Sequence, residues 1–408
     1  MEIVLISIGN ELLNGTVVNT NATWIAQKLY EVGFTVKRVL TISDSKEDIH
    51  RELENNEGVV LITGGLGPTN DDITKACLME HTSSSLILHE PTWQHVRSIF
   101  ERRGVDPGER NKQQAMVPSD AIVFPNEMGT APGLYIKGKK NHIIALPGVP
   151  FEMKHLMQKE VIPLLLKEFK PLELKMETVH IIGVSESHLQ EQVAHWEAQL
   201  PDNIQVAFLP EPGVVKLRLS GFVNGVNDVD QIIKDALDEL HLILGDSIFG
   251  YNGEQMEEIV GEELKRQGKT LSVAESCTGG YLSHLLTSIP GSSEYFKGGF
   301  IAYSNEFKID KLEVEPYIIE KYGAVSIETV EAMAKASLEK TNTDYSIAIS
   351  GIAGPDGGTQ EKPVGTVCIA VFDGNEMKSY QYQFSSNRIV NIRRAAIMSL
   401  NLLRLMVQ

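Results

Sequence analysis

The chain has 408 residues, of which 42% are apolar and 22% charged, a composition typical of a globular protein with two or three domains. Its net charge of −17 and pI near 5.2 argue against general binding to nucleic acid or to anionic membranes. Three cysteines without a C-x-x-C pair predict a reduced, cytoplasmic protein, and the apolar start IVLISI is too short to span a membrane.

The first 170 residues alternate predicted strands and helices with short Gly-rich links. We expect strands near residues 2–8, 34–42 and 58–63, and helices near residues 23–33, 45–56 and 71–80. This alternation predicts a three-layer, doubly wound α/β domain with mostly parallel strands. No G-x-G-x-x-G follows the first strand, which disfavours a dinucleotide-binding Rossmann unit.

Three loops of this domain predict a ligand pocket: GNELLNG, TGGLGPTNDD and LPGVPFEM. Backbone amides of Gly-rich loops approach phosphates closely, and the candidates are Gly64, Gly65, Gly67 and Gly148. A hard divalent cation such as Mg²⁺ prefers carboxylate oxygens, which are offered by Glu11, Asp71 and Asp72. The alternative is structural: Asn70 or Asp71 caps the following helix, and Asp72 is a first-turn acid that opposes its dipole.

Residues 171–250 contain neither Gly-rich loops nor a catalytic cluster. Their pattern of strands and two amphipathic helices predicts a small α+β domain. The segment carries 13 acidic and 4 basic residues, a net charge of −9. Phosphate backbones bind basic surfaces, so we expect no nucleic-acid partner. Residues 249–255, FGYNGEQ, are the predicted linker to an α/β C-terminal domain over residues 255–408.

The most informative segment of the chain is TLSVAESCTGGYLSHLL, in which a short apolar strand ends and an amphipathic helix starts at once. Side-chain hydroxyls and free backbone amides converge at such a junction. Ser276 and Cys277 are alternative nucleophiles between which spacing cannot choose, and the amides of Thr278 and Gly279 can hold a phosphate or an oxyanion. The structural alternative is a tight turn with Ser276 or Thr278 as helix cap.

Two further strand endings favour a pocket in this domain. One strand ends at Tyr303 and is followed by a helix carrying Lys308, and another ends in the Gly-rich loop that begins at Gly351. Ligands bind where several strand ends converge in open α/β sheets. Arg388 and Arg393, at the start of the last helix, are candidates for bidentate phosphate contacts, although a solvated helix face is the alternative.

The motifs AESCTGG, AYSNEFK, YGAVS, SGIAGPDGG and EKPVGTV together resemble the nicotinamide mononucleotide deamidase domain. The resemblance implies that Ser276 is the nucleophile and that Tyr303 and Lys308 activate it and transfer protons. The implied reaction converts nicotinamide mononucleotide to nicotinate mononucleotide and ammonia, and it needs no cofactor. A desolvated lysine can serve as base to a serine hydroxyl, with tyrosine as relay.

The whole chain resembles the competence/damage-inducible protein A (CinA-like) family. TGGLGPTNDDITKA, NKQQAMVP, NEMGTAPG and LPGVPFEM are similar to its N-terminal domain, which is like molybdopterin-binding domains. The resemblance implies a domain over residues 1–170 that binds ADP-ribose and cleaves its pyrophosphate with a divalent metal. Asn10 departs from the family, because many relatives have Asp in this G-D-E-L-L loop. The departure weakens the expectation of hydrolase activity.

The same resemblance implies a KH-type middle domain over residues 171–250 and a homodimer. The GXXG clamp of RNA-binding KH domains is not visible after Ile182. Two rival functions stay open. The chain can be a non-catalytic binding protein of competence, or its N-terminal domain can be a molybdopterin-nucleotide enzyme.

Overall fold

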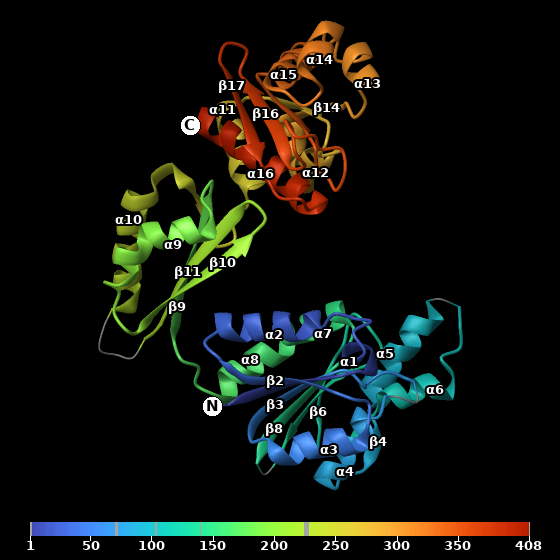
Figure 1. Ribbon diagram of the computed structural model, residues 1–408. Coiled ribbons are helices and arrows are strands. Elements are labelled where there is room, and N and C mark those ends of the chain that lie inside the picture. Colours follow the sequence, from blue (N-terminus) through green and yellow to red (C-terminus); the bar gives the residue numbers. More distant parts are fainter. Residues whose placement is uncertain (1, 70–71, 103, 139, 224–227, 408) are drawn as a thin grey trace. The chain divides into compact units, whose positions relative to one another are not determined.

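The computed structural model describes residues 2–69, 72–102, 104–138, 140–223 and 228–407. Contacts divide the chain into two compact units, Met1–Leu174 and Lys175–Gln408 (Figure 1). The second unit contains both the segment predicted as the middle domain and the segment predicted as the C-terminal domain. Among the described residues, no helix is both long and apolar enough to cross a membrane.

The first unit is built on a six-stranded sheet in the order β2-β1-β3-β8-β7-β6. Strands β2, β1, β3 and β8 are parallel, and β7 and β6 are antiparallel to their neighbours. The strands are β1 Ile3–Ile8, β2 Val36–Ile42, β3 Gly58–Thr63, β6 Ile122–Phe124, β7 Gly133–Lys137 and β8 Asn141–Leu146, with a separate ribbon of β4 Leu86–Leu88 and β5 Met116–Pro118. The predicted doubly wound sheet is therefore confirmed.

Helices cover both faces of this sheet (Figure 1). Every residue of β1 is buried, so Ile3 and Leu5 pack under α2, α7 and α8, whereas Val4 and Ile6 pack against α3 and α4 on the other face. The helices are α1 Asn10–Leu13, α2 Thr20–Glu31, α3 Lys46–Asn55, α4 Thr74–Thr82, α5 Glu90–Glu101, α6 Gly108–Lys112, α7 Pro150–Leu156 and α8 Ile162–Glu168, with η1 Gln113–Ala115 and η2 Met157–Val161. The layers bring the ends of β1, β3 and β8 to one edge of the sheet.

The second unit starts with a four-stranded sheet in the order β10-β11-β9-β12. Its strands are β9 Leu174–Ile182, β10 Ile204–Glu211, β11 Val214–Phe222 and β12 Ile248–Tyr251. Two helices, α9 Glu186–Glu197 and α10 Val229–Leu244, share one apolar cluster with it, and η3 spans Gly245–Ser247. The indole N–H of Trp196 donates to the carbonyl of Ala236 at 3.0 Å and ties the two helices together. The predicted small α+β segment is present.

The rest of the second unit is a five-stranded sheet in the order β14-β13-β15-β16-β17. β13, β14 and β15 are parallel, and β16 and β17 are antiparallel. The elements are α11 Met256–Gln267, β13 Leu271–Glu275, α12 Tyr281–Ser288, η4 Ser292–Glu294, β14 Phe296–Ile301, α13 Asn305–Asp310, α14 Pro316–Tyr322, α15 Ile327–Thr341, β15 Tyr345–Gly351, β16 Thr366–Phe372, β17 Met377–Gln383 and α16 Arg388–Val407.

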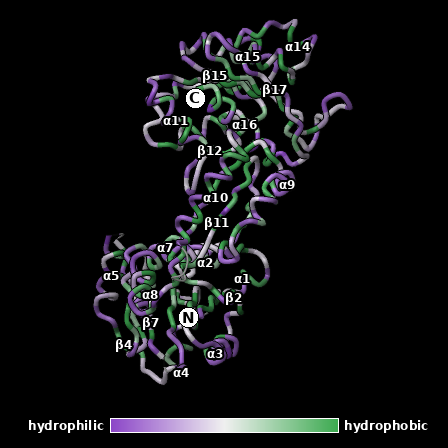
Figure 2. The backbone as a smooth tube through the Cα atoms, turned by 90° about the vertical axis from the view of Figure 1, so that its left-hand side faces the viewer, coloured by the Kyte–Doolittle hydropathy of each residue, from purple (hydrophilic) through white to green (hydrophobic). Residues whose placement is uncertain are grey.

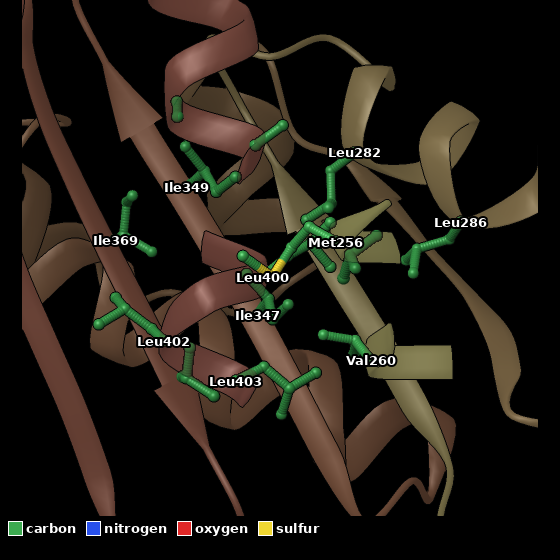
Figure 3. Packing of buried hydrophobic residues seen from close by; sticks show 14 of the residues in the cluster. Met256, Val260, Leu282, Leu286, Ile347, Ile349, Ile369, Leu400, Leu402 and Leu403 are labelled. Carbon is green, nitrogen blue, oxygen red and sulfur yellow. The ribbon is translucent and has the colours of Figure 1, made fainter. Parts of the chain in front are cut away.

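Two apolar layers fix this sheet in place. Helices α11, α12 and α16 bury Val260, Leu282 and Leu403 against Ile347 and Ile369 on one face (Figure 3). Helix α15 buries Met333 on the other face. Hydrophobic residues concentrate along the strands and inner helix faces throughout the chain (Figure 2). The rigid sheet thus holds the C-terminal ends of β13 and β15 next to each other.

Candidate active site

The turn between β13 and α12 carries the predicted nucleophile. Two consecutive glycines, Gly279 at φ 58° and Gly280 at φ 99°, adopt left-handed conformations that other residues rarely adopt, and they allow the chain to reverse within a few residues. The amide of Ser276 donates to the carbonyl of Ile349 at 2.9 Å, so the turn is fastened to β15. Ser276 itself is 7% exposed. The sequence motif therefore forms the predicted strand–turn–helix junction.

Lys308 lies against this serine. Its Nζ donates to Ser276 Oγ at 3.1 Å and to the carbonyl of Ala302 at 2.8 Å. The side chain is 1% exposed, and burial lowers the pKa of the Lys308 amine below its usual value. Helix α13 positions the lysine, and Ser304 caps that helix by accepting from the amide of Phe307 at 3.1 Å. Two side chains 32 residues apart in sequence are thus brought together as a serine–lysine pair.

Cys277 is a poor rival as nucleophile. The side chain is 7% exposed, and burial raises the pKa of its thiol to about 12. A thiolate is the reactive form of cysteine, and at neutral pH this thiol stays protonated. The geometry therefore favours Ser276 where sequence spacing left the choice open.

Glu275 is a site residue that the sequence analysis missed. Its carboxylate is fully buried, yet it accepts from the amides of Gly280 at 3.0 Å, Leu282 at 3.1 Å and Ser283 at 2.8 Å, and from the Ser283 hydroxyl at 2.6 Å. These donors are the unpaired groups at the start of α12. An acid at the end of an apolar strand, directly before the nucleophile, was the available signal. The carboxylate holds the nucleophile turn against the helix.

Thr278 is the best candidate to contact a reacting carbonyl oxygen. It is 3% exposed, and within the described part of the chain its hydroxyl has no hydrogen-bond partner. The amide of Gly279, predicted to bind substrate, instead donates to the carbonyl of Ser276 at 3.1 Å. A buried polar group without a partner is costly, and such groups concentrate at functional sites.

Tyr303 and Arg388 meet at the edge of this site. The guanidinium of Arg388 donates to the Tyr303 hydroxyl at 2.9 Å and to the carbonyl of Gly354 at 2.9 Å. Tyr303 is 59% exposed. Arg388, predicted as a phosphate ligand, thus joins the loop after β15 to the tyrosine that follows β14.

Gly351 and Arg393 have other surroundings than expected. A Cβ at Gly351 would lie 3.0 Å from the Cys277 sulfur and 2.8 Å from Val367, so glycine lets β15 pass close to the nucleophile turn. Arg393 is exposed and lines a separate cavity with Tyr281 and Glu257. The structure brings Ser276, Lys308, Tyr303 and Arg388 to one region, and it places Arg393 at another.

The predicted N-terminal pocket lies at the ends of β1, β3 and β8. A cavity of about 120 Å³ is lined by residues that include Ser7, Glu11, Asn21, Thr63 and Gly148. The side-chain Nδ2 of Asn21 donates to the Gly148 carbonyl at 2.7 Å and to Thr63 Oγ1 at 3.3 Å. Within the described residues, Ser7 Oγ and Asn21 Oδ1 have no partner. These unpaired oxygens and the Glu11 carboxylate are the donor type that a hard cation prefers.

The glycines after β3 shape the same edge. A Cβ at Gly64 would lie 2.4 Å from the Ile8 carbonyl oxygen, and one at Gly65 would lie 2.1 Å from Thr74 Oγ1. Asn10, the departure from the family pattern, donates through its backbone amide to Asp44 at 2.9 Å. The glycines therefore permit the close approach of β1, β3 and α4.

Asp72 has a different role from the predicted first-turn acid. Helix α4 begins only at Thr74, and the Asp72 carboxylate accepts from the amide of Thr69 at 2.7 Å and from its hydroxyl. A Cβ at Gly67 would collide with this carboxylate. The prediction that helix α4 starts before Asp72 is wrong, because Asp72 closes the preceding loop. Asp71 lies outside the described residues, and among those described no three His, Cys, Asp or Glu side chains gather as a metal site.

Three protein families match successive parts of the chain. Residues 4–167 match a probable molybdopterin binding domain, residues 176–250 match the damage-inducible protein CinA KH domain, and residues 253–407 match the CinA C-terminal domain. The matched ranges agree with the fold classes described above. The KH-type resemblance of the middle segment is thereby confirmed.

Relatives cover nearly the whole chain. A CinA-like protein from Cytophaga hutchinsonii is 40% identical over 410 residues, which span 98% of this chain and 96% of the relative. A CinA-like protein from Chloroherpeton thalassium is 39% identical over 411 residues, 98% of each chain. A crystal structure of a competence or damage-inducible protein from Enterobacter asburiae is 35% identical, with a TM-score of 0.37, and covers 38% of this chain and 96% of that one.

Proposed function

The chain belongs to the CinA-like protein family, and on this premise we propose that its C-terminal domain deamidates nicotinamide mononucleotide to nicotinate mononucleotide and ammonia. The observation that carries the proposal is the buried pair of Ser276 and Lys308, with Lys308 Nζ 3.1 Å from Ser276 Oγ. A lysine whose amine is desolvated loses its proton more easily and can then accept one from a hydroxyl. The pair is suited to acyl transfer from an amide.

The proposed steps use groups that already lie at the site. Neutral Lys308 takes the proton of Ser276 Oγ as that oxygen attacks the carboxamide carbon. The Thr278 hydroxyl donates to the oxyanion that forms. The C–N bond breaks, and the proton held by Lys308 passes to the leaving amide nitrogen, which departs as ammonia. Water then hydrolyses the ester on Ser276 by the same base, releases nicotinate mononucleotide and restores the serine. Arg388 donates to the Tyr303 hydroxyl at the edge of the site, and the relay role of Tyr303 rests on the family resemblance.

Incubation with nicotinamide mononucleotide tests this proposal. Release of ammonia and of nicotinate mononucleotide in equal amounts is expected from the purified chain. Ser276→Ala should lower the rate by about 10³ or more, because a covalent nucleophile is lost. A chain that binds nicotinamide mononucleotide without turnover would favour the rival binding protein. Equal rates for the wild type and Ser276→Ala would refute the assignment of the nucleophile.

We also propose that the N-terminal domain binds ADP-ribose and cleaves its pyrophosphate with a divalent metal. The unpaired oxygens of Ser7 and Asn21 beside Glu11 support a polar ligand at this edge of the sheet. The metal would supply charge neutralisation at the pyrophosphate, and Glu11 is the described carboxylate placed to hold it. Calorimetry with ADP-ribose and with a molybdopterin nucleotide, with and without Mg²⁺, separates this proposal from its rival. We also propose that two copies of the chain form a homodimer, which a measurement of the particle mass in solution tests.

A further inference from the structure

The amine of Lys308 has three hydrogen-bond partners, and only one of them is able to give up a proton. Nζ lies 3.1 Å from Ser276 Oγ, 2.8 Å from the carbonyl oxygen of Ala302 and 3.5 Å from that of Tyr303. A neutral amine has two N–H groups and one lone pair. The two carbonyl oxygens accept the N–H groups, because they carry no proton of their own. The lone pair of neutral Lys308 therefore faces the Ser276 hydroxyl, which is the orientation that a base requires.

Among the described residues at this site, no carboxylate or thiolate is free to activate a water molecule. The Glu275 carboxylate already accepts four hydrogen bonds, two on each oxygen, and so has no lone pair left for water. Burial raises the pKa of the Cys277 thiol to about 12, so this group stays protonated at neutral pH. The guanidinium of Arg388 is cationic and accepts no proton. Lys308 is thus the base for both halves of the proposed reaction.

The acyl group on Ser276 meets an incoming nucleophile at the position that ammonia has left. Each step of the proposed mechanism runs in both directions, so a site that releases ammonia from the acyl carbon also lets ammonia attack that carbon. Water must lose a proton to Lys308 as it attacks, whereas a neutral amine attacks with its own lone pair and gives up its proton afterwards. Molecule for molecule, this arrangement favours amines over water as acceptors of the acyl group.

Burial restricts the size of the acceptor. Ser276 is 7% exposed and Lys308 is 1% exposed. Gly351 brings β15 against the nucleophile turn, since a Cβ there would lie 3.0 Å from the Cys277 sulfur. Tyr303 is 59% exposed, so solvent reaches the edge of the site. Small solutes are therefore the ones that can enter from this edge and reach the acyl carbon.

We propose that the C-terminal domain, beyond deamidation, transfers the acyl group of its substrate from Ser276 to small neutral amines and so forms a new amide. This inference rests on the proposed deamidation. In the transfer, the amine nitrogen bonds to the acyl carbon, and the bond between that carbon and Ser276 Oγ breaks. The proton of the amine passes through Lys308 to Ser276 Oγ. No oxidant or reductant takes part, and the serine and the lysine return to their starting state.

Hydroxylamine tests the proposal, because it is small, is neutral at mildly alkaline pH and yields a hydroxamate that ferric iron colours. The full chain is incubated with nicotinamide mononucleotide and increasing hydroxylamine, and ammonia, nicotinate mononucleotide and hydroxamate are measured. The ratio of hydroxamate to nicotinate mononucleotide should double each time the hydroxylamine concentration doubles. The methyl ester of nicotinate mononucleotide should give the same ratio as the amide, because both substrates leave the same acyl group on Ser276.

Two variants locate the transfer. Ser276→Ala should lower hydroxamate formation by about 10³ or more, and the remainder measures the uncatalysed reaction. Cys277→Ala, the matched control one residue away, should leave the product ratio unchanged. Ammonia release without enzymatic hydroxamate, or a product ratio that differs between amide and ester, overturns the transfer and leaves the deamidation standing. Absence of ammonia from nicotinamide mononucleotide instead refutes the deamidation itself and, with it, the transfer.

Discussion

Replacing Glu275 by glutamine tests whether one buried carboxylate holds the nucleophile turn in place. The native carboxylate accepts four hydrogen bonds, two on each oxygen. A glutamine keeps the shape but turns one oxygen into an NH₂ group that faces donors. The lowest-energy orientation keeps the oxygen toward Gly280 and Leu282, because the Ser283 hydroxyl can rotate and accept from the NH₂. The amide of Ser283 then loses its acceptor.

The magnitude follows from this count. One buried N–H without a partner costs about 1–3 kcal/mol, and the bonds that remain lose the extra strength of a charged acceptor. We therefore expect the α12 start to be destabilised by about 2–4 kcal/mol in total. At 1.4 kcal/mol for each factor of ten, local opening becomes roughly 30- to 700-fold more frequent.

Hydrogen exchange measures this effect at the affected amides. Protection at Gly280, Leu282 and Ser283 should fall by that factor in Glu275→Gln, while strands β15 and β16 keep their protection. Deamidation should fall about a hundredfold, since a small misplacement of a reacting group has effects of this size. Glu339→Gln, an exposed acid on α15, is the matched control. Unchanged protection in Glu275→Gln would refute the role given to this carboxylate.

Three further predictions concern single side chains. Cys277→Ala should retain most deamidation, because a thiol with a pKa of about 12 is protonated in the working enzyme; loss of activity comparable to Ser276→Ala would reverse the assignment. Lys308→Arg should be inactive, since guanidinium stays protonated. The kcat/KM of the wild type should rise with pH as the Lys308 amine, whose pKa is lowered by burial, loses its proton. A flat pH profile or an active Arg variant would exclude the role of Lys308 as base. Asp72→Asn keeps an oxygen that can accept from Thr69, so the free energy of unfolding and the deamidation rate should stay nearly unchanged. Loss of metal-dependent ADP-ribose cleavage in this variant would assign Asp72 to the metal site. Cleavage that survives would exclude Asp72 from the metal site.

Much of the fold was predictable because apolar runs mark the buried strands and Gly-rich segments mark the loops that follow them. Strands β1, β2 and β3 and the turn at Ser276 lie where the sequence pattern places them, and the nearly complete burial of β1 and β3 leaves these two strands little choice of structure. The start of α4 was not predictable. Both Asp72 and Thr74 suit a helix start, and only tertiary contacts, the hydrogen bonds to Thr69 and to the Gly64 carbonyl, decide between them.

The candidate site was predictable in its members more than in their contacts. Resemblance selected Ser276 and Lys308, and the structure adds the distance between them and the burial that lowers the lysine pKa. The carboxylate of Glu275 and the link between Arg388 and Tyr303 depend on side-chain directions that spacing does not contain. Arg393, only five residues after Arg388 on α16, lines a cavity that does not include Arg388, because five residues at 3.6 per turn rotate a side chain about 140° beyond one full turn.

The burial of Cys277 makes this residue a natural reporter on its neighbour. Its sulfur lies beside the backbone of Gly351, so an alkylating reagent can reach it only while the nucleophile turn has moved away from β15. The rate at which the thiol is labelled therefore counts the openings of the turn that carries Ser276. Labelling of the adjacent cysteine thus measures how often the turn of the proposed nucleophile opens, a motion for which serine itself has no spectroscopic signal.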